Sequence, residues 1–200
     1  GRCGSATDVT VNEVNFTNAE IMAKDKFGGA MYLGDISGNI AFTNVLFENN
    51  TLAAKTGTKG GSLYIKNATK DVTFTNVNFI DINLISENGL GGALFLGHDM
   101  ETVNMGKVYF KDVNFVNVHA DSTDNDGGAI YFRASTITSF DMDSCKFINT
   151  SSSKEGGAIY YDVMHKFKIS NTVFENITSK DGVVHIVKKA SDITFDGDNF

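Results

Sequence analysis

The sequence predicts an all-β chain that folds as a right-handed parallel β-helix of about six coils, with 26–36 residues and three strands in each coil. Two short motifs that recur along the whole chain predict this fold. One is Gly-Gly followed by a small, an aliphatic and an aromatic residue, and the other is Phe-x-Asn or Phe-x-Asp. Because both motifs return at nearly fixed intervals, each repeat is expected to form one coil of a solenoid.

The Gly-Gly motif marks one corner of each predicted coil. Glycine adopts positive φ angles and lets neighbouring backbones approach closely, and both properties suit a corner between stacked coils. Five clear copies are present, and a diverged sixth copy reads Asp181-Gly182-Val183-Val184-His185. The clear copies begin at Gly28, Gly60, Gly91, Gly127 and Gly156.

The leading phenylalanine of the second motif is expected to form a column inside the solenoid. Its copies are Phe16, Phe47, Phe79, Phe115, Phe147 and Phe174, at intervals of 31, 32, 36, 32 and 27 residues. Phe200 follows 26 residues later, where a seventh copy would start. We therefore expect residues 1–200 to be a single β-helical domain that belongs to a longer protein.

Each repeat contains three short segments in which apolar and polar residues alternate, such as residues 127–132, 72–76 and 77–81. This period of two predicts strands. Columns of Phe, Val and aliphatic residues are expected to fill the interior, with Cys145 in the Val column, and Asn columns are expected to pair amide to amide at corners. A β-sandwich is disfavoured, since it does not require the same residue type at the same place in every repeat.

Two copies of the first motif, Gly127–Ile130 and Gly156–Ile159, read Gly-Gly-Ala-Ile, and residues 47–50 also fit Phe-x-x-Asn. This combination resembles the repeat of the chlamydial polymorphic outer membrane proteins, and similar repeats occur in adhesin-like surface proteins of other microbes. The resemblance covers the whole chain, although most copies here read Phe-x-Asn. It implies a right-handed β-helix in an extracellular passenger or stalk with adhesive or structural work, and it brings no catalytic residues.

Composition and charge exclude several classes of function. The chain has 200 residues and a net charge of −7, which argues against nucleic acid or an anionic membrane surface as the main partner. No apolar run approaches the roughly 18–20 residues that span a bilayer as a helix. Neither cysteine has a metal-ligand spacing, and Cys3 and Cys145 are expected to lie several coils apart, too far for a disulfide. No cofactor is expected.

An enzyme is not expected, because the 4 His are scattered and no Ser/His/Asp order is recognisable. The alternative is a carbohydrate-binding or polysaccharide-cleaving β-helix of the pectate-lyase type, which needs carboxylates and a nearby Lys or Arg on one exposed strand face. Asp141 and Asp143 flank inward-facing Met142, so both are expected to point outward. Their neighbours in the columns include Tyr109, Lys111 and Lys168, which favours a surface salt-bridge ladder of small energetic worth.

Two further patterns are candidates for ion binding and modification. The loop from His119 to Asp126 alternates Asp and Asn, and Asp121, Asp124 and Asp126 are candidate Ca²⁺ ligands. This loop lacks the later Glu of an EF-hand, and a solvated acidic turn is the favoured alternative.

Five Asn-x-Ser/Thr sequons are candidate N-glycosylation sites, although stacking columns already explain several of these Asn residues. The sequons lie at Asn15, Asn49, Asn67, Asn149 and Asn176.

The fifth position of the Gly-Gly motif is occupied by an aromatic residue or His in every copy. Its neighbours on either side are mostly aliphatic and are expected to face inward, which turns this position outward. The sequence thus predicts an aromatic ladder along one exposed face, either as packing between neighbouring rings or as a docking strip for a sugar chain or a second rod. Its members are Tyr32, Tyr64, Phe95, Tyr131, Tyr160 and His185.

Together these observations predict a non-catalytic, extracellular structural or adhesive β-helical rod of a cell-surface or secreted repeat protein. Protein or glycan surfaces are the expected partners. Self-association is also expected, end to end or side by side, because an uncapped coil exposes unpaired strands.

Overall fold

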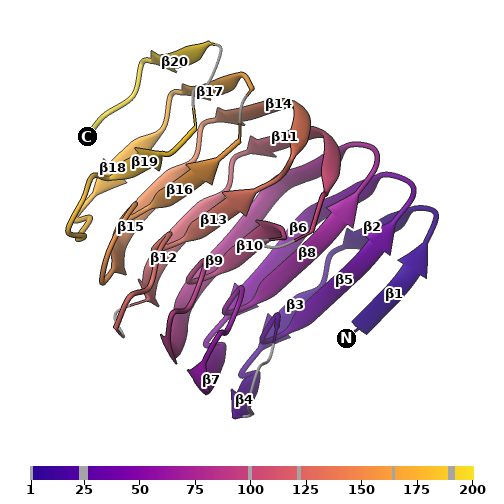
Figure 1. Cartoon of the computed structure of the whole chain (residues 1–200), viewed down its shortest axis with the longest axis horizontal. Coiled ribbons are helices and arrows are strands. Elements are labelled where there is room, and N and C mark those ends of the chain that lie inside the picture. Colours follow the sequence, from indigo (N-terminus) through magenta and orange to yellow (C-terminus); the bar gives the residue numbers. More distant parts are fainter. Residues whose placement is uncertain (1, 23–26, 99–100, 121–122, 164, 189–191) are drawn as a thin grey trace.

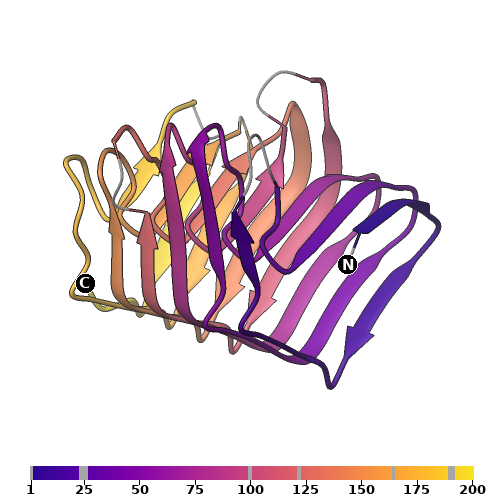
Figure 2. The same cartoon turned by 90° about the horizontal axis from the view of Figure 1, so that it is seen from below.

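The computed structural model describes residues 2–22, 27–98, 101–120, 123–163, 165–188 and 192–200, with side chains from residue 7 onward. The described residues form 20 β-strands and no helix. The strands pair in parallel with those of the preceding and following repeats, so that they lie side by side from one end of the molecule to the other (Figures 1 and 2). The predicted parallel β-helix is confirmed.

The strands form three faces, and each coil contributes to each face. The first face contains β1 (Arg2–Ala6), β5 (Met31–Ile36), β8 (Leu63–Ala68), β10 (Leu94–Gly97), β13 (Ile130–Arg133), β16 (Ile159–Asp162) and β19 (Val184–Ile186). The second contains β2 (Val9–Asn12), β6 (Ile40–Glu48), β9 (Val72–Glu87), β11 (Asn104–Lys111), β14 (Thr136–Asp143), β17 (Phe167–Ser170) and β20 (Ile193–Asp196).

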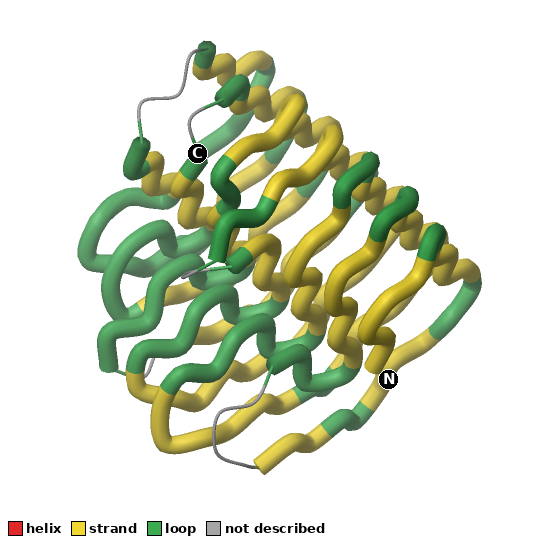
Figure 3. The backbone as a smooth tube through the Cα atoms, turned by 45° about the vertical axis from the view of Figure 1, so that its right-hand side comes forward, coloured by secondary structure: helices red, strands yellow, loops and turns green. Residues whose placement is uncertain are grey.

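The third face begins with β3 (Asn15–Thr17), continues through the later parts of β6 and β9, and ends with β12 (Asn114–Ala120), β15 (Lys146–Ser152) and β18 (Val173–Glu175). Two more strands lie beyond it: β4 (Glu20–Met22) pairs with β7 (Thr51–Thr56), and β7 pairs with the later part of β9. The segments between strands are stacked in the same way (Figure 3).

The core consists of columns of identical or similar side chains, as the repeat predicts. The leading phenylalanines stack from Phe16 to Phe200, with ring centroids 4.8–5.0 Å apart and nearly parallel planes. This separation equals the spacing of hydrogen-bonded strands, so backbone pairing and ring stacking are satisfied together. A second column runs from Val11 through Phe42, Phe74 and Phe110, and these three rings are fully buried.

Two corners of each coil are formed by single residues in the left-handed backbone region, where Asn and Asp are the most tolerated side chains. Their amides form ladders along the rod: Asn76 Nδ2 donates to Asn44 Oδ1 over 2.8 Å, and Asn149 Nδ2 donates to Asn117 Oδ1 over 2.7 Å. The predicted amide pairing is therefore confirmed. The first corner contains Glu13, Asn44, Asn76, Asp112, Ser144, Asn171 and Gly197, and the second contains Asn18, Asn49, Asp81, Asn117, Asn149 and Asn176.

The Gly-Gly corner meets both conditions that the sequence predicts. The first glycine of each copy has a φ of +62° to +72°. The second glycine lies directly against the next coil: a Cβ on Gly61 would stand 2.0 Å from the carbonyl oxygen of Gly92. Because no side chain fits in that space, Gly-Gly allows the coils to approach at the strand spacing at this corner.

Cys145 occupies the Val column beside Val113 and is a free, buried cysteine. Burial raises the pKa of its thiol to about 12, so the thiol stays protonated and packs as a small apolar group. The backbone of Cys3 pairs with that of Leu33, and four coil intervals along the first face separate β1 from β13 in the coil of Cys145, in agreement with the expected separation of several coils.

Replacing Phe79 by Ala should lower the free energy of unfolding by roughly 3–5 kcal/mol, because it removes a fully buried ring that stacks on Phe47 and Phe115. Chemical denaturation measures this loss. Phe200→Ala is the matched control from the same column, where the ring is 64% exposed, and its effect should be much smaller. Equal effects of the two substitutions would contradict the assignment of the core.

Replacing Asn117 by Ala should cost about 1–2 kcal/mol, because alanine is strained at a φ of +54° and cannot bond Asp81 or Asn149. Asn117→Gly loses the same side-chain hydrogen bonds but fits the backbone, so it should cost less. Denaturation of both variants separates the two contributions. If Gly is as harmful as Ala, the amide ladder rather than the backbone dominates this corner.

Candidate functional site: a charged groove on the second face

A shallow groove of ≈ 390 Å³ lies on the outer side of the second face, across β11, β14 and β17. The alternation of β14 creates it: Phe140 and Met142 are buried, whereas Asp141 and Asp143 point outward, as predicted. Because the coils are in register, side chains from three repeats meet on this surface. The groove is lined by polar residues that include Lys107, Tyr109, Asp141, Asp143, Lys168 and Asp196.

The charges in the groove alternate in sign between coils. Lys107 Nζ lies 3.7 Å from Asp141 Oδ2, and Lys111 Nζ lies 3.1 Å from Asp143 Oδ2. The Lys107 ammonium also lies 4.7 Å from the centre of the Tyr109 ring, a cation–π arrangement. The Lys111–Asp143 pair agrees with the predicted salt-bridge ladder, whereas Asp141 pairs with Lys107 rather than with the predicted neighbour Lys168. These partly exposed ion pairs contribute little to stability.

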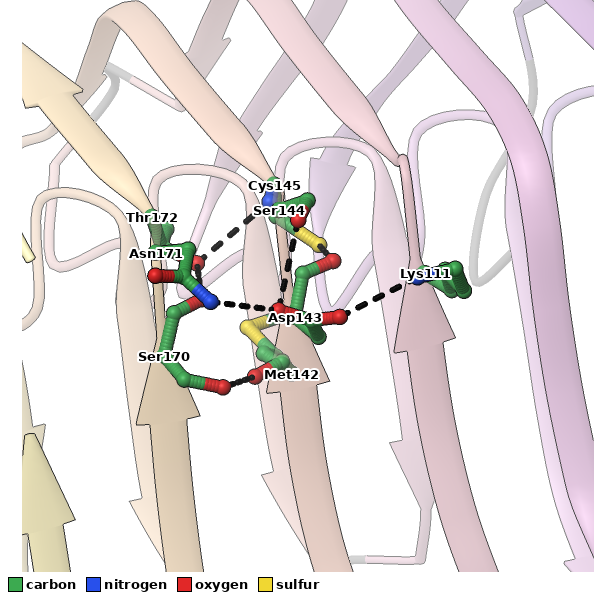
Figure 4. Close-up of polar contacts among 8 residues, drawn as sticks. All are labelled: Lys111, Met142, Asp143, Ser144, Cys145, Ser170, Asn171 and Thr172. Carbon is green, nitrogen blue, oxygen red and sulfur yellow. Dashed lines mark hydrogen bonds and ion pairs between the residues drawn. The ribbon is translucent and has the colours of Figure 1, made fainter. Parts of the chain in front are cut away.

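Asp143 is the centre of the polar contacts at the upper end of β14 (Figure 4). Its carboxylate accepts hydrogen bonds from Asn171 Nδ2 at 2.9 Å, Lys111 Nζ at 3.1 Å and Ser144 Oγ at 3.2 Å. The bond from Asn171, followed by that from Lys111, holds the pKa of the Asp143 carboxyl below its ordinary value. Asn171 comes from the following coil, and the motif spacing did not associate it with Asp143.

The two outward carboxylates of β14, Asp141 and Asp143, differ in their surroundings. Hydrolysis of a glycosidic bond by two carboxyl groups requires one of them to be protonated, usually through a raised pKa. The lowered pKa of Asp143 fits the ionised member of such a pair rather than the proton donor. Asp141 accepts a hydrogen bond from Ser139 Oγ at 2.8 Å in addition to its contact with Lys107. The groove thus presents charged and hydrogen-bonding side chains on one outward surface.

The predicted aromatic ladder forms, but its predicted exposure is wrong. Consecutive rings from Tyr32 to His185 lie 4.5–5.3 Å apart. Tyr64, Phe95 and Tyr131 are at most 4% exposed, while Tyr32, Tyr160 and His185 are half-buried. The ladder therefore cannot serve as an open docking strip along its length.

The residues just before each Gly-Gly pair explain this burial. They form their own column of parallel bridges, Phe27 to Lys59, Lys59 to Leu90 and Leu90 to Asp126, and this column lies beside the rings. The ring of Phe27 lies 5.4 Å from that of Tyr64, and Lys59 Nζ lies 5.6 Å from the Phe95 ring. These covering residues all directly precede Gly-Gly in the sequence, so their position could have indicated a column. Because Phe27, Lys59 and Leu90 differ in chemistry, the sequence did not indicate that they cover the rings.

In the described part of the candidate Ca²⁺ loop, the carboxylates of Asp124 and Asp126 differ in exposure and in their surroundings. Asp124 is exposed with a φ of +58°, whereas Asp126 is buried and lies 3.8 Å from Lys154 Nζ. Burial raises the pKa of Asp126. Asp121 lies outside the described residues, and Ca²⁺ binding by this loop stays a prediction.

The candidate glycosylation sites differ in accessibility. Asn15, Asn49, Asn149 and Asn176 are exposed, and Asn67 is half-buried. At Asn49 and Asn149 the amide nitrogen that would carry a glycan donates a 2.7 Å hydrogen bond within the corner ladder. A glycan there would compete with the ladder, and modification of all five stays a prediction.

Comparisons with protein-family models, with curated proteins and with solved structures find no match. None of the described segments forms a helix with the length and hydropathy needed to cross a membrane. The fold and the groove are therefore the basis for functional inference.

Replacing Asp143 by Asn should lower stability by about 1 kcal/mol or less at pH 7, since its contacts are near the surface. Because the folded-state pKa of Asp143 is lowered, its contribution is present above the unfolded carboxyl pKa and is lost as pH falls through the folded value. Unfolding free energies of the two proteins should therefore converge near pH 2. A difference in unfolding free energy that does not change with pH would contradict the ionised Asp143 carboxylate as the source of the stabilisation.

Proposed function

We propose that this protein is a non-catalytic, extracellular structural and adhesive rod that binds an extended polar partner through the charged groove. The observation that carries the proposal is the register of the groove. Tyr109, Asp141, Lys168 and Thr194 occupy one column across β11, β14, β17 and β20. Since successive strands are about 4.8 Å apart, the groove offers polar contacts at a regular spacing along the rod.

A glycan chain is the partner that this surface fits best. Hydroxyl groups of a sugar both donate and accept hydrogen bonds, so they suit a groove in which ammonium and carboxylate groups alternate. Tyr109 adds an aromatic side chain on the same surface. A charged protein surface, including the same face of a second rod lying side by side, is the competing partner class.

A polysaccharide-cleaving β-helix is the second candidate, because Asp141 and Asp143 lie on one outward face with Lys168 beside Asp141. The lowered pKa of Asp143 argues only against this carboxyl as a general acid. Placement outside the cell, at a cell surface or in secreted form, rests on the resemblance of the Gly-Gly-Ala-Ile motifs to those of the chlamydial surface proteins.

Replacing Tyr109 and Lys168 together by Thr should weaken glycan binding at least tenfold while the rod stays folded. Thr already occupies this column at Thr73 and Thr194 in the adjacent coils, so the change respects the repeat. Binding to a panel of neutral and acidic polysaccharides is measured by surface plasmon resonance.

Lys146→Asn is the matched control, because it removes one positive charge from the third face and reproduces Asn114 of the preceding coil. It should leave binding unchanged. Equal binding by all three proteins would contradict the groove as the adhesive surface. Release of new reducing ends that Asp141→Asn abolishes would establish the cleaving enzyme instead.

A further inference from the structure

The last copy of the repeat departs from the others at two positions that the fold brings together. In the aromatic ladder, His185 replaces the Tyr or Phe of all preceding coils. In the column before Gly-Gly, Glu155 and Asp181 form a parallel bridge, and the earlier coils have Phe27, Lys59, Leu90 and Asp126 at this position. Two carboxylates and one imidazole therefore meet at one place on the first face.

The side chains of Glu155, Asp181 and His185 form a compact cluster. His185 Nε2 lies 3.4 Å from Glu155 Oε2, and His185 Nδ1 lies 3.2 Å from Asp181 Oδ2. One ligand atom from each residue lies within 4.8 Å of the others. The imidazole also stacks on the Tyr160 ring, with centroids 5.3 Å apart, which fixes the plane of the ring.

These distances suit a transition-metal ion between Nε2 and the Glu155 carboxylate. Two ligands at about 2.0–2.1 Å from a tetrahedral Zn²⁺ are roughly 3.3 Å apart, close to the separation seen here. A zinc-bound imidazole usually donates its other N–H to a carboxylate, which fixes its tautomer and orientation. Asp181 already occupies that position at Nδ1.

The partial burial of His185 and Glu155 also suits the binding of a metal ion. The side chains of His185 and Glu155 are 22% and 30% exposed, so a solvent ion can enter and water can complete the coordination shell. Asp126 of the preceding coil acts electrostatically on the same cluster and adds to its negative field, although Lys154 pairs with it.

We propose that Glu155 and His185 bind a zinc ion and that Asp181 orients the imidazole as a positioning residue. The ion would join the loop before β16 to β19 of the next coil and so hold two successive coils together. This inference does not depend on the proposed adhesive function, because the cluster lies on the first face and the groove on the second.

Titration of the full chain with ZnCl₂ in isothermal calorimetry tests the proposal. We expect one zinc ion per chain and a thermal midpoint that rises with zinc concentration, since the ion binds the folded state. His185→Tyr should abolish this binding, and it restores the residue found at Tyr160 and Tyr131, so the stack is kept. Glu155→Gln should weaken binding at least tenfold, and Asp181→Asn by about 10–100-fold.

His119→Asn is the matched control, because Asn83 occupies the same column in the preceding coil. It should leave zinc binding unchanged. Absence of zinc binding would overturn the proposal and leave the cluster as a purely ionic contact. Binding that survives in both His185→Tyr and Glu155→Gln would place the metal elsewhere and overturn it equally. Circular dichroism of each variant verifies that the comparison is between folded chains.

Discussion

The in-register stacking of coils at the strand spacing of about 4.8 Å is the constraint on which the whole structure depends. Backbone hydrogen bonds require this spacing, and the stacked phenylalanines from Phe16 to Phe200 satisfy it with centroids 4.8–5.0 Å apart. Gly-Gly allows the coils to approach at one corner, and left-handed Asn residues turn the chain at two others. Each repeat therefore has the same few residue types at the same positions.

The same constraint determines what the surface can do. Outward side chains of successive coils form columns, so charges that are far apart in sequence, such as Lys111 and Asp143, become neighbours. Any function that uses such a surface has contacts at a regular spacing, which suits an extended partner. Local departures from the repeat, such as His185 after Tyr160, place a different side chain in one coil of an otherwise uniform column.

Much of the fold could be predicted from the sequence, because a column requires one residue type at one position of every repeat. The Phe columns, the Val column with Cys145, the Gly-Gly corner and the outward direction of Asp141 and Asp143 follow from that rule. The covering of the aromatic ladder could not be predicted, because Phe27, Lys59 and Leu90 share a position but no chemistry. The contact of Asn171 with Asp143 and the cluster around His185 depend on side-chain geometry between coils, which spacing alone does not specify.

Distances between spin labels along one column test the stacking most directly. Thr17, Ile148 and Glu175 share a column on the third face, four coil intervals separating Thr17 from Ile148 and five separating it from Glu175. Pulsed electron paramagnetic resonance on the label pairs 17/148 and 17/175 should give mean separations near 19 and 24 Å, a difference of about 4.8 Å, apart from a common linker offset. Separations that are equal, or that decrease as the second label moves from 148 to 175, would contradict the account.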